Sequence, residues 1–128
     1  MDMIYQVKTE KGFDDAVLSL KEACASVGFG TLWQLNFKDK LQEKGLPFDD
    51  NYMILEVCNP VKAQQVLLEH REAGFFLPCK VAVYEKDGEV FMGMPKPTEL
   101  MSMLGSETLK AVAVEVEEAL VAAIQKAV

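Results

Sequence analysis

The chain has 128 residues, of which 50% are hydrophobic and 9% aromatic, and its formal net charge is −7. This length is typical of a single domain over residues 1–128, and the apolar content excludes a disordered tail. The acidic balance argues against the basic stripe with which nucleic-acid-binding proteins contact phosphates, so we expect no nucleic-acid partner.

The sequence gives no sign of secretion or membrane insertion. Residues 1–5 have neither the basic start nor the apolar segment of a signal peptide. A membrane-spanning helix needs a run of about 18 apolar residues, and the sequence contains none, so we expect no membrane partner. The three cysteines, Cys24, Cys58 and Cys79, are odd in number and widely spaced, unlike a disulfide framework. We therefore expect a cytoplasmic protein with reduced thiols.

The first half of the chain predicts three strands and two helices. Residues 3–8 alternate as a strand does, and the apolar stripe of the following helix ends at Gly28. Residues 31–37 alternate as a second strand. Asn36, near its end, is expected to cap the short helical turn that follows. Residues 52–58 are almost continuously apolar. Such a run predicts a central strand that is covered on both faces.

Asn59 and Pro60 predict the start of the next helix. The Asn59 side chain can accept a hydrogen bond from a free amide of the first turn, and Pro60 suits the first helical position. The helix is expected over residues 61–73, with Gly74 ending it.

A β-hairpin is predicted around the pair Asp87-Gly88. This pair supplies the two positive φ angles of a type I′ turn between strands at 80–84 and 89–94. The expected cross-strand pairs are Lys86–Glu89, Tyr84–Phe91 and Val83–Met92. The hairpin therefore carries apolar pairs on both faces, and only one of these faces can pack on the protein's own core.

Two helices are predicted after the hairpin. The first spans residues 99–104, with Thr98 as its cap and Gly105 as its end. The second is the longest element of the chain, over residues 107–127, with Ser106 as its cap.

Several of these segments resemble the domain of unknown function 302 family. The segments are Met53 to Pro60 (Met-Ile-Leu-Glu-Val-Cys-Asn-Pro), Leu77 to Glu85 (Leu-Pro-Cys-Lys-Val-Ala-Val-Tyr-Glu), Gly28-Phe29-Gly30 and Val112 to Ala119. The resemblance covers essentially the whole chain. It implies a compact α+β fold in a stand-alone prokaryotic domain that is homodimeric. The family has no settled activity, so the resemblance gives no catalytic residue.

Cys58, Cys79 and His70 are the candidate metal ligands. Cys58 ends one predicted strand, Cys79 begins another, and His70 lies on the helix between them. Two thiols and an imidazole suit a soft metal, and two thiols that meet could also form a switchable disulfide or supply a nucleophile. Free cysteine is more often a buried small hydrophobe, and His70 between charged neighbours is more often solvated. We therefore expect no metal and no cofactor.

Four methionines, Met92, Met94, Met101 and Met103, occur close together in the sequence. Thioethers can form an adaptable binding groove or bind Cu(I). The sequence favours the simpler interpretation, in which they fill gaps beneath a short helix.

The order of elements predicts an α+β fold. In this fold a five-stranded mixed or antiparallel sheet is packed by two long helices, with shorter helices at the edges. The alternative is a doubly covered α/β sheet. The apolar pairs on both hairpin faces and the strand at 52–58 would leave a monomer with an exposed apolar patch, so we expect a homodimer.

The sequence contains no complete set of catalytic residues, and whether the chain is an enzyme stays open. The favoured function is a homodimeric, non-enzymatic protein that binds a small-molecule ligand or a partner. The alternative is a thiol-dependent or soft-metal-binding protein that uses Cys58 and Cys79.

Overall fold

Five strands form one sheet in the computed structural model, which describes residues 3–128. They are β1 (Ile4–Thr9), β2 (Gly30–Asn36), β3 (Tyr52–Cys58), β4 (Cys79–Lys86) and β5 (Glu89–Pro95). Their order across the sheet is β1-β5-β4-β3-β2, and each neighbouring pair is antiparallel. The predicted α+β fold is confirmed, and the sheet is antiparallel rather than mixed.

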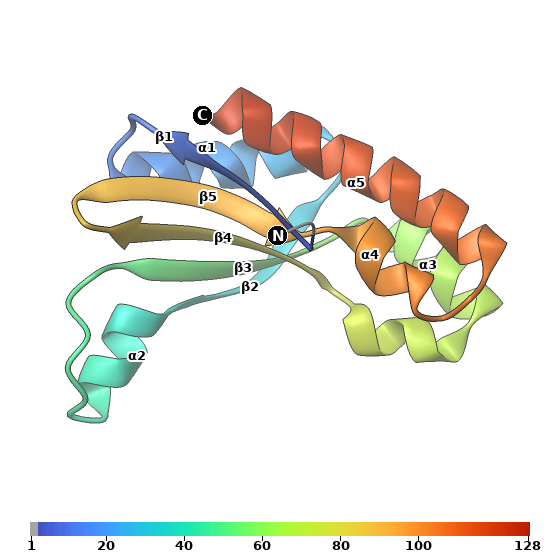
Figure 1. The fold of residues 1–128 in the computed structure, drawn as a ribbon, viewed down its shortest axis with the longest axis horizontal. Helices are drawn as coiled ribbons and strands as arrows, with labels where there is room; N and C mark the ends of the chain where they lie inside the picture. The colour runs from blue at the N-terminus through green and yellow to red at the C-terminus, as the bar shows by residue number, and fades with distance from the viewer. Residues whose placement is uncertain (1–2) are drawn as a thin grey trace.

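Helices α1 and α5 pack on one face of this sheet, α3, η1 and α4 gather at one of its ends, and α2 lies apart from them at the other end, next to β2 and β3 (Figure 1). The elements are α1 (Phe13–Ser26), α2 (Phe37–Glu43), α3 (Pro60–Glu69), the 3₁₀ helix η1 (Arg71–Phe76), α4 (Pro97–Ser102) and α5 (Glu107–Ala127). The apolar stripes of α1 and α5 bury alternate residues of the central strands, among them Leu55, Val81, Val83 and Met92. Within residues 3–128, no helix is long and apolar enough to cross a membrane.

The opposite face of the sheet is not covered by α1 or α5, and we call it the open face. Its side chains alternate with those of the core, as the strand registers require. The residues of the open face are Ile4, Gln6 and Lys8 of β1; Trp33 and Leu35 of β2; Tyr52, Ile54 and Glu56 of β3; Lys80, Ala82, Tyr84 and Lys86 of β4; and Glu89, Phe91 and Gly93 of β5.

The prediction that residues 52–58 form a central strand covered on both faces is wrong. β3 is next to the edge strand β2, and the long helices α1 and α5 cover only one face of the sheet. Ile54 on the open face is still only 9% exposed, because it lies between Leu35 of β2 and Ala82 of β4. An apolar run can thus be buried partly by its neighbours within the sheet. The doubly covered α/β alternative is therefore wrong as well.

The helix predicted over residues 61–73 is shorter than expected. α3 ends at Glu69, because His70 has an extended backbone with φ −157° and ψ 112°, and η1 follows. This change of direction buries Ala73 completely in a second small core with Val66 and Met101. Gly74 lies within η1 and does not end α3.

Three of the four predicted helix caps are confirmed. The side chains of Asn36, Asn59 and Ser106 accept hydrogen bonds from the amides of the residues two or three positions later, at 3.0, 3.2 and 3.3 Å. Thr98 is not a cap, because α4 already begins at Pro97. The Thr98 amide and hydroxyl instead donate to Glu117 Oε1, at 3.0 and 2.7 Å, and thereby tie α4 to α5.

The predicted hairpin turn is also confirmed. Asp87 and Gly88 have φ angles of 53° and 77°, as a type I′ turn requires. The strand register matches all three predicted cross-strand pairs. The hairpin therefore presents Tyr84 and Phe91 together on the open face.

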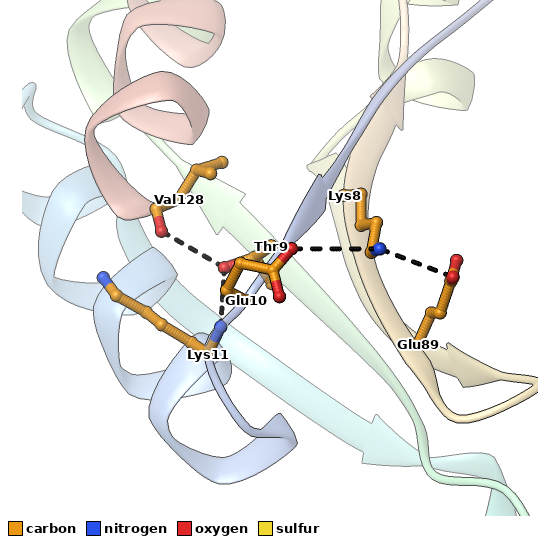
Figure 2. Close-up of polar contacts among 6 residues, drawn as sticks. All are labelled: Lys8, Thr9, Glu10, Lys11, Glu89 and Val128. Carbon is orange, nitrogen blue, oxygen red and sulfur yellow. Dashed lines mark hydrogen bonds and ion pairs between the residues drawn. The ribbon is translucent and has the colours of Figure 1, made fainter.

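A polar junction ties β1 to the end of α5 (Figure 2). The Thr9 hydroxyl, which is almost fully buried, donates to the main-chain oxygen of Val128 at 3.2 Å and accepts from the Lys11 amide at 3.2 Å. Lys11 Nζ donates to the Ala127 carbonyl at 2.7 Å. A cation at this helix end stabilises the unpaired carbonyls of the last turn.

Candidate ligand-binding site

A pocket of about 330 Å³ lies at the end of the sheet, beside η1 and α4. We call it the end pocket. Its apolar wall includes Phe76, Leu77, Met94, Leu100, Met101 and Leu120, and its remaining lining includes Glu56, Cys79 and Lys80. Small-molecule sites are mostly apolar and occupy about 300–1,000 Å³. The end pocket is therefore large enough for a small ligand, at the lower end of this range.

Two charged groups stand side by side at the end pocket. Glu56 of β3 and Lys80 of β4 are cross-strand partners, and both line the pocket. Glu56 is partly buried and Lys80 is exposed. Throughout residues 3–128, neither side chain has an ion pair or a hydrogen bond. Both charges are thus available to a ligand.

A second, much smaller hollow adjoins the end pocket, and we call it the cysteine cavity. Its volume is about 40 Å³, and its lining includes Val57, Cys58, Asn59, Leu77, Cys79 and Val112. A water molecule needs at least about 10–15 Å³ by this measure. The cysteine cavity therefore has room for a few waters and not for an organic ligand. The two hollows are neighbours, because both are lined by Leu77, Pro78, Cys79, Pro97 and Met101.

The structure brings Cys58 and Cys79 to one cavity but does not activate Cys79. Cys58 and Cys79 are free thiols that line the same cavity, and both are partly rather than fully buried. Burial, and then the neighbouring Cys58, raise the pKa of Cys79 to about 11. The nucleophile is the thiolate, so a thiol with a raised pKa is a poor one at neutral pH.

Cys24 also belongs to this group, which the sequence reasoning missed. It is fully buried on α1, and burial followed by the nearby Cys79 raises the pKa of Cys24 to about 11. The signal was available, because the apolar stripe of α1 places Cys24 toward the sheet. Nothing in the sequence indicated which strand it would meet.

The structure does not join His70 to the two cysteines as a metal site. In the described part of the chain, no three His, Cys, Asp or Glu side chains form a group that could hold a metal ion. His70 is partly buried rather than solvated, and its Nδ1 atom lies 3.3 Å from Glu72 Oε2 without hydrogen-bond geometry.

The four methionines lie in different environments. Met92 and Met94 are buried in the main core, Met101 is buried in the second core, and Met103 is 65% exposed. Three of them are therefore core residues, but Met92 and Met94 pack with the long helices α1 and α5 rather than beneath a short helix. Met94 and Met101 also form part of the end-pocket wall, so a binding role for these two remains compatible with their burial.

Two other hollows of similar volume are less suited to an apolar ligand. One, of about 350 Å³, is lined largely by polar residues near the end of α5, including Lys11 and Lys126. The other, of about 330 Å³, lies beside the hairpin turn and includes Lys8 and Glu89. Some of their charged groups already have partners: Lys11 Nζ donates to the Ala127 carbonyl, and Lys8 Nζ lies 3.4 Å from Glu89 Oε1 in an ion pair that is drawn in Figure 2.

A row of aromatic rings crosses the open face. Phe37 meets Tyr52 edge-on at a centroid distance of 6.0 Å, and Tyr52 stacks on Tyr84 at 5.0 Å. Tyr84 stacks on Phe91 at 5.3 Å. Beside this row a shallow hollow of about 250 Å³ is lined by residues that include Ile54, Ala82 and Gly93. The open face thus has an apolar, partly aromatic centre with a shallow depression beside the aromatic row.

Sequence reasoning did not identify the polar or the aromatic part of the end pocket. Glu56 is the one charged residue in the apolar run of β3, and Lys80 lies at the start of β4. Each was visible alone, but their proximity depends on the pairing of β3 with β4. Phe75 and Phe76 were expected to follow the end of a helix and instead belong to η1.

Comparisons with known proteins agree with the fold. A family model described as "Domain of unknown function DUF302" matches residues 5–127. The chain is similar to the crystal structure of an uncharacterized conserved protein DUF302 from Bacillus stearothermophilus. The two share 41% sequence identity with a TM-score of 0.96, and the match covers 100% of each chain. No curated protein matches the sequence.

Proposed function

Because the chain belongs to the DUF302 family, whose function is unknown, we propose a function from the geometry of this molecule alone. It is a non-enzymatic, homodimeric domain that binds a small molecule in the end pocket. The observation that carries the proposal is the apolar pocket of about 330 Å³ with two unpaired charges at its side. Such a combination gives affinity through burial and orientation through a few polar groups.

The lining of the pocket supports binding rather than catalysis. Its ionisable groups are Glu56, Lys80 and the Cys79 thiol. Cys79 stays protonated at neutral pH, because its pKa is raised to about 11. General acid–base catalysis works best with groups whose pKa lies near the working pH. The raised pKa thus weighs against thiol catalysis.

The alternative function, thiol or soft-metal chemistry at Cys58 and Cys79, has one observation in its favour. Both residues line the cysteine cavity as free thiols. A soft metal would bind thiolates, and burial makes the Cys79 thiolate costly.

The three free thiols support the cytoplasmic location that we propose for this protein.

The homodimer of this proposal uses the open face. Strands of six to eight residues, at about 3.3 Å per residue and about 4.8 Å between strands, give a sheet of roughly 20 by 25 Å. Side chains project from this face, so its accessible area is larger than the area of the flat sheet. It approaches the roughly 800 Å² that each partner buries in a standard interface. A second copy of the open face would cover the aromatic row.

The charge distribution also supports self-association. The apolar centre of the open face, around Ile54 and Ala82, is flanked by charges of both signs, Lys8, Lys80, Lys86, Glu56 and Glu89. The face is therefore close to neutral, although the whole chain carries −7. Two copies would meet there without strong like-charge repulsion.

A pocket-filling variant tests ligand binding. Anilinonaphthalene sulfonate, a fluorescent apolar anion, should bind the native protein and gain emission. Leu100→Trp places an indole at the pocket wall and should remove most of this gain. Leu18→Trp, at an exposed position on α1, is the matched control and should leave it unchanged. Equal emission from the native protein and both variants would contradict binding in the end pocket.

A further inference from the structure

We propose that the end pocket binds a free α-amino acid with an aromatic side chain. The inference rests on the proposed function and names the chemical class of its ligand. Its basis is the pair Glu56 and Lys80, which line the pocket as neighbours on adjacent strands.

The first argument is charge complementarity. Glu56 offers a carboxylate, and Lys80 offers an ammonium group. Directly opposed residues on antiparallel strands have Cβ atoms about 4.5–5.5 Å apart. An α-amino acid carries its own ammonium and carboxylate on one carbon, so it can place the ammonium against Glu56 and the carboxylate against Lys80. A ligand with a single charge would attract one of these residues and repel the other.

The second argument is the availability of both charges. Glu56 and Lys80 are neighbours, yet among residues 3–128 neither forms an ion pair with the other or with any other group. By contrast, Lys8 and Glu89, also neighbours on the open face, do pair at 3.4 Å. The Glu56–Lys80 pair is thus open to insertion of a ligand with both charges.

The third argument concerns the side chain of the ligand. Phe76, Met94 and Met101 are part of the apolar wall of the pocket. Methionine sulfur makes favourable contacts with aromatic rings, and unbranched methionines adapt to the shape of a ligand. Aromatic rings also pair favourably with one another, as a ligand ring would with Phe76. The volume of about 330 Å³ suits a single amino acid better than a large cofactor.

Three ligands that have the same aromatic ring but differ in their charged groups test this inference. L-Phenylalanine has both charges, 3-phenylpropionate has only the carboxylate, and 2-phenylethylamine has only the ammonium group. Titration calorimetry of the full chain should show that L-phenylalanine binds at least tenfold more tightly than either analogue. Glu56→Gln should reduce the affinity for L-phenylalanine without weakening 3-phenylpropionate. Lys80→Gln should reduce it without weakening 2-phenylethylamine.

The outcomes distinguish this inference from the proposed function. Similar affinities for all three ligands would overturn the inference, while an apolar binding pocket would stand. Binding of anilinonaphthalene sulfonate in the end pocket without binding of L-phenylalanine would have the same meaning. The inference would be supported if Glu56→Gln and Lys80→Gln lost the preference for L-phenylalanine and still bound the analogues that carry a single charge. Binding of those analogues would also show that both variants are folded.

Discussion

The rings of Tyr52 and Tyr84 stack on the open face, with centroids 5.0 Å apart and planes inclined by 13°. The two residues are cross-strand partners on β3 and β4, so the stack follows from the strand register. Offset stacking of aromatic rings is favourable beyond the area that it buries. The stack forms the middle of a row that runs from α2 across to β5, and this row is the surface on which the proposed homodimer depends.

A charge at the centre of the open face should break the homodimer. Ala82→Glu would place a buried, unpaired carboxylate between two copies, and such a group is costly to desolvate. Sedimentation of the native protein should give twice the mass of the 14.2 kDa chain, and this variant should sediment as a single chain. Ala25→Glu, at an exposed position on α1, changes the net charge equally and should remain dimeric. A native protein that sediments as a single chain would rule out the dimer.

Gly93 should not tolerate a side chain. A Cβ atom there would clash with the Tyr5 carbonyl oxygen and come within 2.8 Å of Gln6 Cα, because β1 approaches β5 closely at this point. Gly93→Ala should lower the free energy of unfolding in urea by about 1–3 kcal/mol. Gly30→Ala is a fair comparison, since a Cβ there meets nothing within 4 Å. Equal stability of the two variants would contradict the close packing of β1 on β5.

The hairpin turn should depend on Gly88. Its φ of 77° is unfavourable for a β-branched residue, so Gly88→Val should cost more than about 1 kcal/mol of unfolding free energy. Gly88→Asn should cost less, since asparagine tolerates this conformation. Thermal denaturation of the three proteins checks the order, and an unchanged midpoint in Gly88→Val would contradict the type I′ turn.

The buried thiols should make the protein less stable in alkali. The pKa values of Cys24 and Cys79 are raised from 9.0 to about 11, so the folded state keeps protons that the unfolded chain loses in this range. Their contribution to stability is therefore complete below pH 9 and is lost as the pH rises toward 11. Urea unfolding across this range should show the decrease. A variant with both Cys24→Ala and Cys79→Ala should show a smaller one, and an identical decrease would argue against raised thiol pKa values.

The elements that the sequence predicted best are those with local causes. Asn36, Asn59 and Ser106 cap their helices through hydrogen bonds to amides two or three residues away. Asp87 and Gly88 set the turn through their own φ angles. In each case the interacting groups lie within one turn of the chain, so a short segment carries the whole signal.

The incorrect predictions depend on contacts between distant segments. The apolar run of β3 does not show whether a helix or a neighbouring strand buries Ile54. The helical pattern beyond Glu69 gives way to η1 because Ala73 is buried against Val66 and Met101. The candidate site has the same origin, since Glu56 and Lys80 meet only through the pairing of β3 with β4.

The most direct test of a small-molecule site in the end pocket is a titration of ¹⁵N-labelled protein with indole, followed by two-dimensional NMR. Indole is neutral and aromatic, so it tests the apolar pocket independently of Glu56 and Lys80. The account predicts saturable shifts of the amides around the pocket, including those of Phe76, Leu77 and Leu100. Shifts confined to the open face around Tyr84, or no saturable shifts at all, would contradict it.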